Sequence, residues 1–151
     1  MLIESLKLGT LEIPDDKVIH LQKPILGFER LTEFCLVEVD DLRPFLWLQA
    51  VEEPSVAFLV VNPTIFFPNY RIEVNPQELA ELRIERVEKV ETYVILTAHA
   101  NPENTSVNLQ GPILINTDNN RAKQLVLVNS DYQVRQRLID VALEVDEPVA
   151  V

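Results

Sequence analysis

Two histidines, His20 and His99, are the residues of this sequence best suited to proton transfer or metal binding. They lie in different apolar segments, and no cysteine or carboxylate accompanies either one at the spacing of a metal site. A metal ion or an acid–base pair needs several groups that converge on one point, which this separation does not provide. We interpret both histidines as structural or exposed strand residues, and we expect no metal site.

Cys35 and the paired carboxylates Asp40-Asp41 and Glu52-Glu53 are the remaining candidates for catalysis. Cys35 lies in an alternating apolar run, which is typical of a small core residue. Neighbouring side chains in a strand or turn diverge, so neither carboxylate pair converges on a substrate. The glycine-rich phosphate-binding loops and the GxSxG motif are absent from the sequence as well. We therefore expect no catalytic or cofactor site, and the protein is not predicted to be an enzyme.

The segment from Asn62 to Tyr70 combines aromatic residues with prolines directly after the apolar run 55–61. Proline fixes φ and lacks a backbone N–H, so this segment is predicted to be a shaped connection rather than more strand. Its prolines and aromatic residues are Pro63, Phe66, Phe67, Pro68 and Tyr70. Either the aromatic rings fold back as a lid on the core, or they face outward and bind a partner.

Composition indicates one globular domain. The chain has 151 residues, of which 47% are hydrophobic and 25% charged, enough to form a core without staples. A single cysteine excludes an internal disulfide framework, and no apolar run is long enough to span a membrane, so we expect a cytoplasmic protein. The net charge of −11 is spread along the sequence with no basic stripe, which argues against direct nucleic-acid binding.

Short apolar runs separated by turn residues predict a mainly all-β fold, a sandwich or a barrel. The first is a strand pair in residues 2–13 that turns at Gly9-Thr10. The further predicted strands are 18–21, 34–39, 45–51, 55–61, 93–98, 112–116 and 124–128. The run 55–61 is almost entirely apolar, as expected of a strand buried on both faces or one that closes a barrel.

Helix is predicted only as one or two short turns. Asn75 and Pro76 are typical of an N-cap and a first helical position. Over residues 81–91 we expect a short helix followed by a strand. Ser130-Asp131 is predicted to cap a last helical turn through Tyr132 and Leu138. Residues 139–151 alternate, end acidic, and are predicted to form an edge strand or a tail.

An ordered series of short motifs resembles the FliW family of bacterial flagellar assembly factors. In order, the matching residues are Pro24–Glu29 (PILGFE), Pro44–Gln49 (PFLWLQ), Pro54–Phe58 (PSVAF), Asn62-Pro63 with Phe66, Phe67, Pro68 and Tyr70, then Asn104–Ile113 (NTSVNLQGPI), Asn116, Gln124 and the Tyr132 region. The sequence departs from the family pattern at Gly111, where alanine is expected, and in its extension after Arg137.

The resemblance implies a FliW-like β-barrel domain over residues 1–138 with no catalytic activity, cofactor or metal. It implies that the protein binds flagellin in the cytoplasm and, when flagellin is exported, binds the RNA-binding regulator CsrA instead. In the family this antagonism of CsrA is regarded as allosteric and relieves repression of flagellin mRNA translation. A negative surface beside the RNA site of CsrA would also repel RNA. The resemblance leaves the oligomeric state open.

The resemblance assigns partner binding to Asn62, Pro63, Phe66, Phe67 and Tyr70. An aromatic side chain in a rigid loop loses little entropy on binding and is a typical hot spot. The alternative is that Phe66 or Phe67 plugs the barrel end while Asn62 caps the turn. Gly27 is interpreted as a turn residue with positive φ, and Trp47 as core.

Two other functions remain open at this point. One is a β-barrel that binds a small ligand, which requires a polar, concave interior, for example a pocket lined by His20 or His99. The other is a chaperone-like protein that binds flagellin and never engages CsrA. The strand residues, which are almost only Leu, Val, Ile and Phe, favour a protein-binding regulator over the small-ligand barrel.

Overall fold

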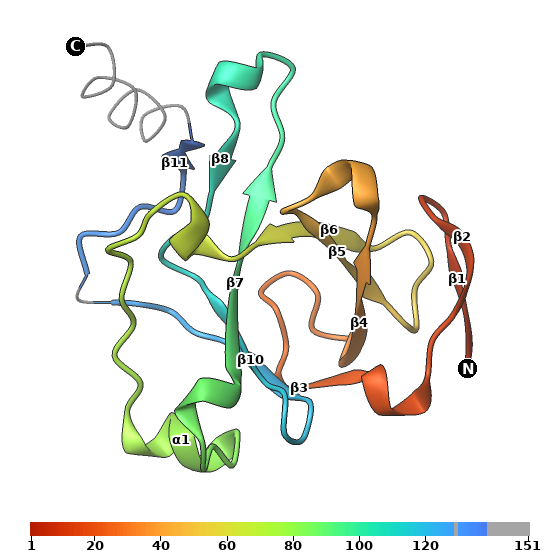
Figure 1. The fold of residues 1–151 in the computed structure, drawn as a ribbon, viewed down its shortest axis with the longest axis horizontal. Helices are drawn as coiled ribbons and strands as arrows, with labels where there is room; N and C mark the ends of the chain where they lie inside the picture. The colour runs from red at the N-terminus through yellow and green to blue at the C-terminus, as the bar shows by residue number, and fades with distance from the viewer. Residues whose placement is uncertain (129, 139–151) are drawn as a thin grey trace.

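The computed structural model describes residues 1–128 and 130–138, so the predicted acidic strand or tail at 139–151 lies outside the described residues. Among these described residues the fold is mainly β, and its one bounded α-helix is the short α1 (Figure 1). In chain order the strands are β1 Leu2–Ser5, β2 Gly9–Glu12, β3 Ile19–Lys23, β4 Glu33–Glu38, β5 Leu46–Ala50, β6 Ala57–Val61, β7 Val90–Thr97, β8 Ser106–Val107, β9 Ile113–Asn116, β10 Arg121–Gln124 and β11 Gln136–Arg137.

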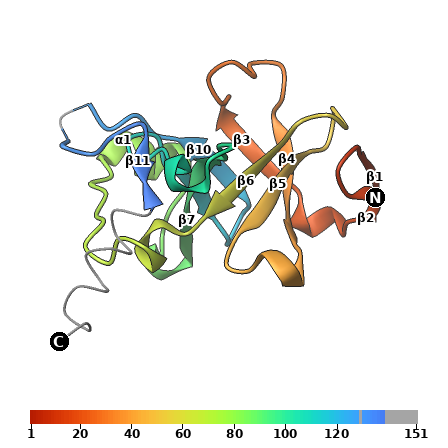
Figure 2. The same ribbon diagram turned by 90° about the horizontal axis from the view of Figure 1, so that it is seen from above.

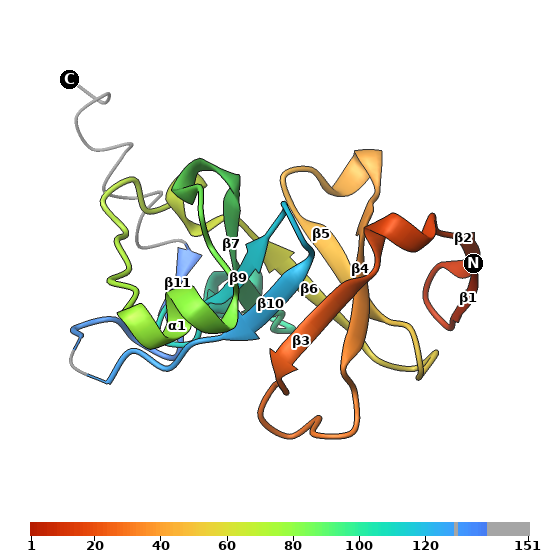
Figure 3. The same cartoon turned by 90° about the horizontal axis from the view of Figure 1, so that it is seen from below.

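The large sheet closes into a barrel. Its strands follow the order β7-β6-β5-β4-β3-β10-β9, and β9 pairs back onto β7 to complete the ring. The neighbours are antiparallel except β3 and β10, which run parallel with Leu21 opposite Ala122. Figure 3 shows β3 and β10 side by side. The all-β, barrel-like prediction is therefore confirmed, and the apolar run 55–61 contributes β6 to the ring.

Strand β7 is shared between two branches of the sheet. Its first half, Val90–Tyr93, pairs with β9, whereas Leu96 and Thr97 pair with β8. Strand β11 then pairs with the other edge of β8. Strands β8 and β11 thus extend the sheet beyond the barrel, on the side where the Asn62–Tyr70 segment lies (Figure 1).

Side chains that point into the barrel form its core because strand residues alternate between the two faces. The core contains Ile19, Leu21, Ile25, Phe34, Leu48, Ala50, Val60, Ile113, Ile115 and Ala122, all buried. Phe28 packs edge-on against Phe58 with ring centroids 4.9 Å apart and helps to fill one end. Cys35 is fully buried, as predicted, and burial raises the pKa of its thiol.

The N-terminal strands β1 and β2 form a separate hairpin against the outside of the barrel, seen at the right of Figure 2. The Ser5 hydroxyl donates to Gln49 Oε1 at 2.7 Å, and the Leu6 N–H donates to the Pro54 carbonyl at 2.9 Å. The hairpin is confirmed, but its turn spans residues 6–8 and not Gly9-Thr10. Gly9 instead opens β2 opposite Ser5.

Trp47 was predicted to be core and is only half buried. The alternation that sends Leu46 and Leu48 into the barrel turns Trp47 to the outside. There Lys7 of the hairpin places its Nζ 5.1 Å from the ring centroid, a cation–π contact. The apolar character of Trp47 suggested a core position, but the alternation of side chains along β5 turns it outward.

The predicted helical turn at Asn75 is confirmed as α1, Pro76–Glu81. Asn75 Oδ1 accepts from the Glu78 N–H at 2.9 Å, and the Glu78 carboxylate accepts from the Asn75 N–H, a capping box. A 3-10 turn at Val87–Lys89 leads into β7, so the expected helix-then-strand order also holds, with β7 beginning earlier than predicted. Gly27 has φ of +89°, as predicted.

The predicted strand 124–128 is displaced. The regular ladder occupies 121–124, because the Asn116–Asn120 turn is tight and β10 pairs with β9 at once. Leu125 and Leu127 still donate to the carbonyls of Pro112 and Gln110, at 2.8 and 2.9 Å. Pro112 has no N–H to return, so the ladder is one-sided there.

The helical turn predicted from Ser130 to Leu138 is wrong over residues 130–137. This stretch runs through a turn at 134–135 into β11, which pairs with β8. Ser130 Oγ does accept from the Tyr132 N–H, at 3.3 Å, but the ring of Tyr132 packs on Tyr70 with centroids 4.5 Å apart. This long-range packing outweighs the local capping signal.

The unusual glycine of the family pattern, Gly111, lies in a turn built on Asn108. Asn108 Oδ1 accepts from the N–H groups of Gln110 and Gly111, at 3.1 and 3.0 Å. A Cβ at position 111 would lie 2.8 Å from Asn108 Nδ2, so alanine would require the Asn108 amide to move.

No helix among the described residues is both long and apolar enough to cross a membrane.

Candidate partner-binding surface

The Asn62–Tyr70 segment begins as a capped 3-10 turn, Pro63–Ile65. Asn62 Oδ1 accepts from the N–H of Thr64 at 3.0 Å and from its hydroxyl at 2.7 Å. Pro63 occupies the first position of the turn, where no N–H is needed, and its ring is buried. Asn62 and Pro63 therefore fix the shape of the segment, and the side-chain oxygen of Asn62 is already engaged.

The rings of Phe66 and Phe67 are half buried. They therefore fit neither a fully buried lid nor a fully exposed binding surface, the two alternatives drawn from the sequence. Both pack on a set of buried residues that we call the loop cluster: Val61, Tyr70, Val94, Val107 and Leu109. Phe66 also stacks on Phe45, with ring centroids 5.8 Å apart and planes at 25°. Each ring thus contributes to packing while part of it stays exposed.

Tyr70 is a buried anchor of this segment. Its side chain is 7% exposed, and its hydroxyl donates to the Leu109 carbonyl at 2.6 Å. Burial, together with the neighbouring Tyr132, raises the pKa of the Tyr70 phenol. The Tyr132 hydroxyl accepts from the Arg71 N–H at 2.9 Å, which fastens the chain just beyond the segment.

Ile65 is the residue that the sequence interpretation missed. It follows Thr64 at the end of the capped turn and is 53% exposed. Beneath the turn, an open groove of about 420 Å³ runs from Pro63 and Tyr70 to Val87 and is lined mostly by apolar side chains. The only sequence signal for Ile65 was its position, directly before two aromatic residues on a capped turn.

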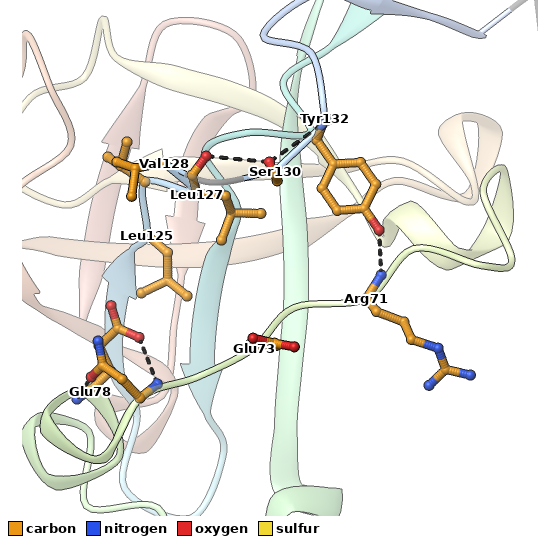
Figure 4. A pocket seen from close by; sticks show the side chains of 10 residues that line it. Arg71, Glu73, Glu78, Leu125, Leu127, Val128, Ser130 and Tyr132 are labelled. Atoms are coloured by element: carbon orange, nitrogen blue, oxygen red, sulfur yellow. Dashed lines mark hydrogen bonds between the residues drawn. The ribbon is translucent and has the colours of Figure 1, made fainter.

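A second groove, also about 420 Å³, is lined by Tyr132 and by Arg71, Glu73 and Asn75, which alternate with the residues Ile72 and Val74 of the first groove (Figure 4). One wall is the stretch from Arg71 to Asn75 and the start of α1; the opposite wall is the stretch 125–128. Leu125 and Leu127 project into the space between these walls, and Tyr132 closes one end (Figure 4).

A third, broader groove opens at the barrel end near His20. Its floor is apolar, formed by Leu36, Leu46, Tyr93 and Ile115. Carboxylates line its rim, at Asp15, Asp16, Glu38, Glu91 and Asp118. His20 lies on its wall, exposed, with Nδ1 3.6 Å from Glu33. His99 lies elsewhere, where its Nδ1 accepts from the Asn101 N–H.

The structure thus separates the residues assigned to partner binding. Phe66 and Phe67 reach the surface; Asn62 is a cap, and Pro63 and Tyr70 are buried. The partner-binding role stays a prediction for all of them, and only Phe66 and Phe67 can meet a partner directly through a ring face. Within the described part of the chain, no three His, Cys, Asp or Glu side chains gather as a metal site would require.

Known proteins similar to this chain agree on one family. The sequence model of the FliW protein family matches residues 2–138. A flagellar assembly factor FliW of Thermosipho africanus is 36% identical over 91% of this chain and 96% of its own length. The flagellar assembly factor FliW of Bacillus velezensis is 34% identical over 89% of this chain and 94% of its own length. A crystal structure of the flagellar assembly factor FliW superposes with a TM-score of 0.86 at 33% identity, covering 91% of this chain and 96% of its own.

Proposed function

This chain belongs to the FliW family of flagellar assembly factors, and from that membership we propose that it acts by binding protein partners in the cytoplasm, without catalysis. The first partner is flagellin. When flagellin has been exported, the second is CsrA, whose repression of flagellin mRNA translation is relieved by an allosteric effect of binding.

One observation supports a protein-binding role for the Asn62–Tyr70 segment. A capped, proline-containing turn presents Ile65, 53% exposed, beside the half-buried rings of Phe66 and Phe67. Apolar side chains on a rigid turn lose little entropy on binding and are typical of interface hot spots. The anchoring of Tyr70 and Pro63 makes the turn rigid.

The charge of the chain agrees with the proposed second partner. A net charge of −11 disfavours RNA and attracts a basic, RNA-binding protein over distances of about 10 Å at moderate salt. Binding to CsrA is therefore expected to weaken as salt rises, mainly through the association rate.

Separate calorimetric titrations with purified flagellin and purified CsrA test the proposal. We expect heat from both, and competition when flagellin is added to the complex with CsrA. An RNA gel-shift assay with CsrA then reports whether the chain releases RNA. Heat with flagellin alone would favour the flagellin-only chaperone, and no heat with either partner would contradict the proposal.

The small-ligand barrel is the second candidate, favoured by the groove that includes His20. Its apolar floor and acidic rim match a ligand with a cationic group and an apolar body. A thermal-shift screen with cationic amphiphiles, using Tyr93→Ala as the variant that removes part of the floor, would test it. Stabilisation of the unchanged chain but not of the variant would support this candidate.

A further inference from the structure

The stretch 125–128 has one free backbone edge. Leu125 and Leu127 direct their N–H groups to the carbonyls of Pro112 and Gln110. In an extended chain successive N–H groups point to opposite sides, so the N–H of Val126 points away from that partner, while Val128 begins the turn that follows. Among residues 1–128 and 130–138, no group hydrogen-bonds to the backbone of Val126 or to the N–H of Val128.

The edge is free because strand β3 stops beside it. β3 pairs with β10 in parallel as far as Lys23, opposite Lys123. Pro24 follows, which has no N–H, and Ile25 turns into the barrel core, where it is 3% exposed. The position beside Val126 that a longer β3 would occupy therefore holds no strand of the described residues.

Among the described residues, this edge carries none of the features that usually protect one. Natural edge strands are blocked by proline, by charged side chains or by a covering segment. Residues 124–128 read Gln-Leu-Val-Leu-Val, with neither proline nor charge. Val126 and Val128 are 59% and 77% exposed, whereas Leu125 is buried. The groove of Figure 4 lies against the same stretch and can accept side chains.

We propose that the edge at Val126 and Val128 binds an extended segment of a partner polypeptide by strand addition. The N–H and C=O groups of Val126 and the N–H of Val128 pair with the backbone of that segment. The side chains of the segment that meet the exposed valines are apolar, and those on its other face meet the groove where Leu125 and Leu127 lie. This surface is separate from Phe66 and Phe67 and goes beyond the proposed function.

The occupant is a polypeptide because the free groups are backbone donors and an acceptor on two nearby residues, Val126 and Val128. A small molecule would satisfy one of them, while an extended chain satisfies them together. Peptides that add to a sheet edge derive affinity from main-chain hydrogen bonds and specificity from pockets for alternate side chains. With a net charge of −11 on the protein, lysine at the outward positions of the peptide assists association.

Capped seven-residue peptides that alternate valine or leucine with threonine or lysine are the probe. Nuclear magnetic resonance on the full chain measures exchange of each backbone amide with and without peptide. We expect the amides of Val126 and Val128 to slow by about tenfold or more on binding. Those of Leu125 and Leu127, already bonded, should change little. Slow exchange confined to every second residue is a pattern that non-specific adhesion does not produce.

Val126→Pro and Val126→Thr form a matched pair of variants. Proline removes a donor that no described group uses and suits the extended backbone, so the fold should remain. Threonine keeps the N–H and the branched shape. We expect Val126→Pro to weaken peptide binding about five- to tenfold, and Val126→Thr by no more than about twofold.

Three results would overturn the proposal. The first is that none of the peptides binds the unchanged chain. The second is that a peptide binds while the Val126 and Val128 amides exchange as before. The third is that sedimentation without peptide shows a dimer that Val126→Pro dissociates, which would make a second copy of the chain the occupant. If Val126→Pro does not fold, the exchange pattern of the unchanged chain still decides.

Discussion

The hydroxyl of Tyr70 donates to the carbonyl of Leu109 at 2.6 Å, a buried hydrogen bond between the candidate segment and the connection from β8 to β9. Replacement of Tyr70 by phenylalanine leaves that carbonyl without its partner in a dry environment. We expect Tyr70→Phe to lower the free energy of unfolding by about 1–2 kcal/mol. For a chain of this size the melting temperature should fall by about 2–8 °C, measured by calorimetry.

Tyr93→Phe is the matched control for this change. The Tyr93 hydroxyl donates to Glu91 Oε2 at 2.7 Å, but Glu91 is exposed and can bond to water instead. We expect a loss well below that of Tyr70→Phe. An equal loss in both variants would contradict the anchoring role of the Tyr70 hydroxyl.

Because the rings of Phe66 and Phe67 are half buried, we expect the double variant Phe66→Ala, Phe67→Ala to affect both partner binding and stability. Partner binding should weaken, and the free energy of unfolding should also fall by about 1–3 kcal/mol, because one side of each ring packs on the loop cluster. Calorimetric titration with flagellin or CsrA and thermal unfolding measure the two effects separately.

Two single variants separate those effects. Ile65→Ala should change stability by about 0.5 kcal/mol or less, since Ile65 is exposed, yet weaken partner binding. Phe45→Ala removes the stacking partner of Phe66 and should affect mainly stability. If neither Ile65→Ala nor the double variant changes partner binding, the rings serve only as a lid.

Asn116 holds the turn after β9 through a buried side chain. Its Nδ2 donates to the carbonyls of Leu82 and Arg83, at 2.9 and 3.0 Å, and its Oδ1 accepts from the Asp118 N–H. In Asn116→Asp an ionised oxygen would face those carbonyls. We expect a loss of about 3 kcal/mol at pH 7, more than in Asn116→Ala.

The same variant should show a distinctive pH dependence. Burial among carbonyls raises the folded-state pKa of the new carboxyl above its unfolded value, so the protonated form is the better tolerated one. Relative to Asn116→Ala, the aspartate variant should regain stability as the pH is lowered towards the unfolded pKa and lose it as the pH rises. Denaturant unfolding between pH 4 and pH 8 would measure this; a flat difference would contradict the geometry.

Glu81 and Lys123 join α1 to β10, with Lys123 Nζ 2.7 Å from Glu81 Oε2. The hydrogen bond from Lys123, with a smaller one from Gln77, lowers the pKa of Glu81. A lowered folded pKa contributes stability above the unfolded pKa of about 4.3, lost as the pH falls through the folded value. Glu81→Gln should therefore melt below the unchanged chain at pH 7, and the difference should shrink as the pH approaches 3. An undiminished difference at pH 3 would contradict a charge-based role.

Period-two apolar runs were sufficient to predict most barrel strands. The run 55–61 became β6, and the cap at Asn75 became α1, since both signals are local. Three interpretations failed where distant residues decide: Trp47, which the barrel turns outward; the 124–128 strand, displaced by a tight turn and Pro112; and the helical turn near Tyr132, overridden by Tyr70.

The candidate site could be predicted only as a segment. The prolines and aromatic residues marked 62–70 as shaped and apolar, but the distribution of its side chains depends on residues far along the chain. Tyr70 turns inward because the Leu109 carbonyl lies there, and Phe66 lies against Phe45. Ile65 remains outside because none of the described residues covers it in this way. The free edge at Val126 likewise depends on where β3 ends.

The parallel pairing of Leu21 in β3 with Ala122 in β10 has a consequence for how the protein is made. The ring cannot close until β10 has left the ribosome, while β3 to β6 emerge long before it. Such non-local closure is entropically costly, so folding is expected to be slow and to finish only after β10 has been synthesised. During that interval the early strands are exposed to aggregation, and the dependence on chaperones should be greatest then.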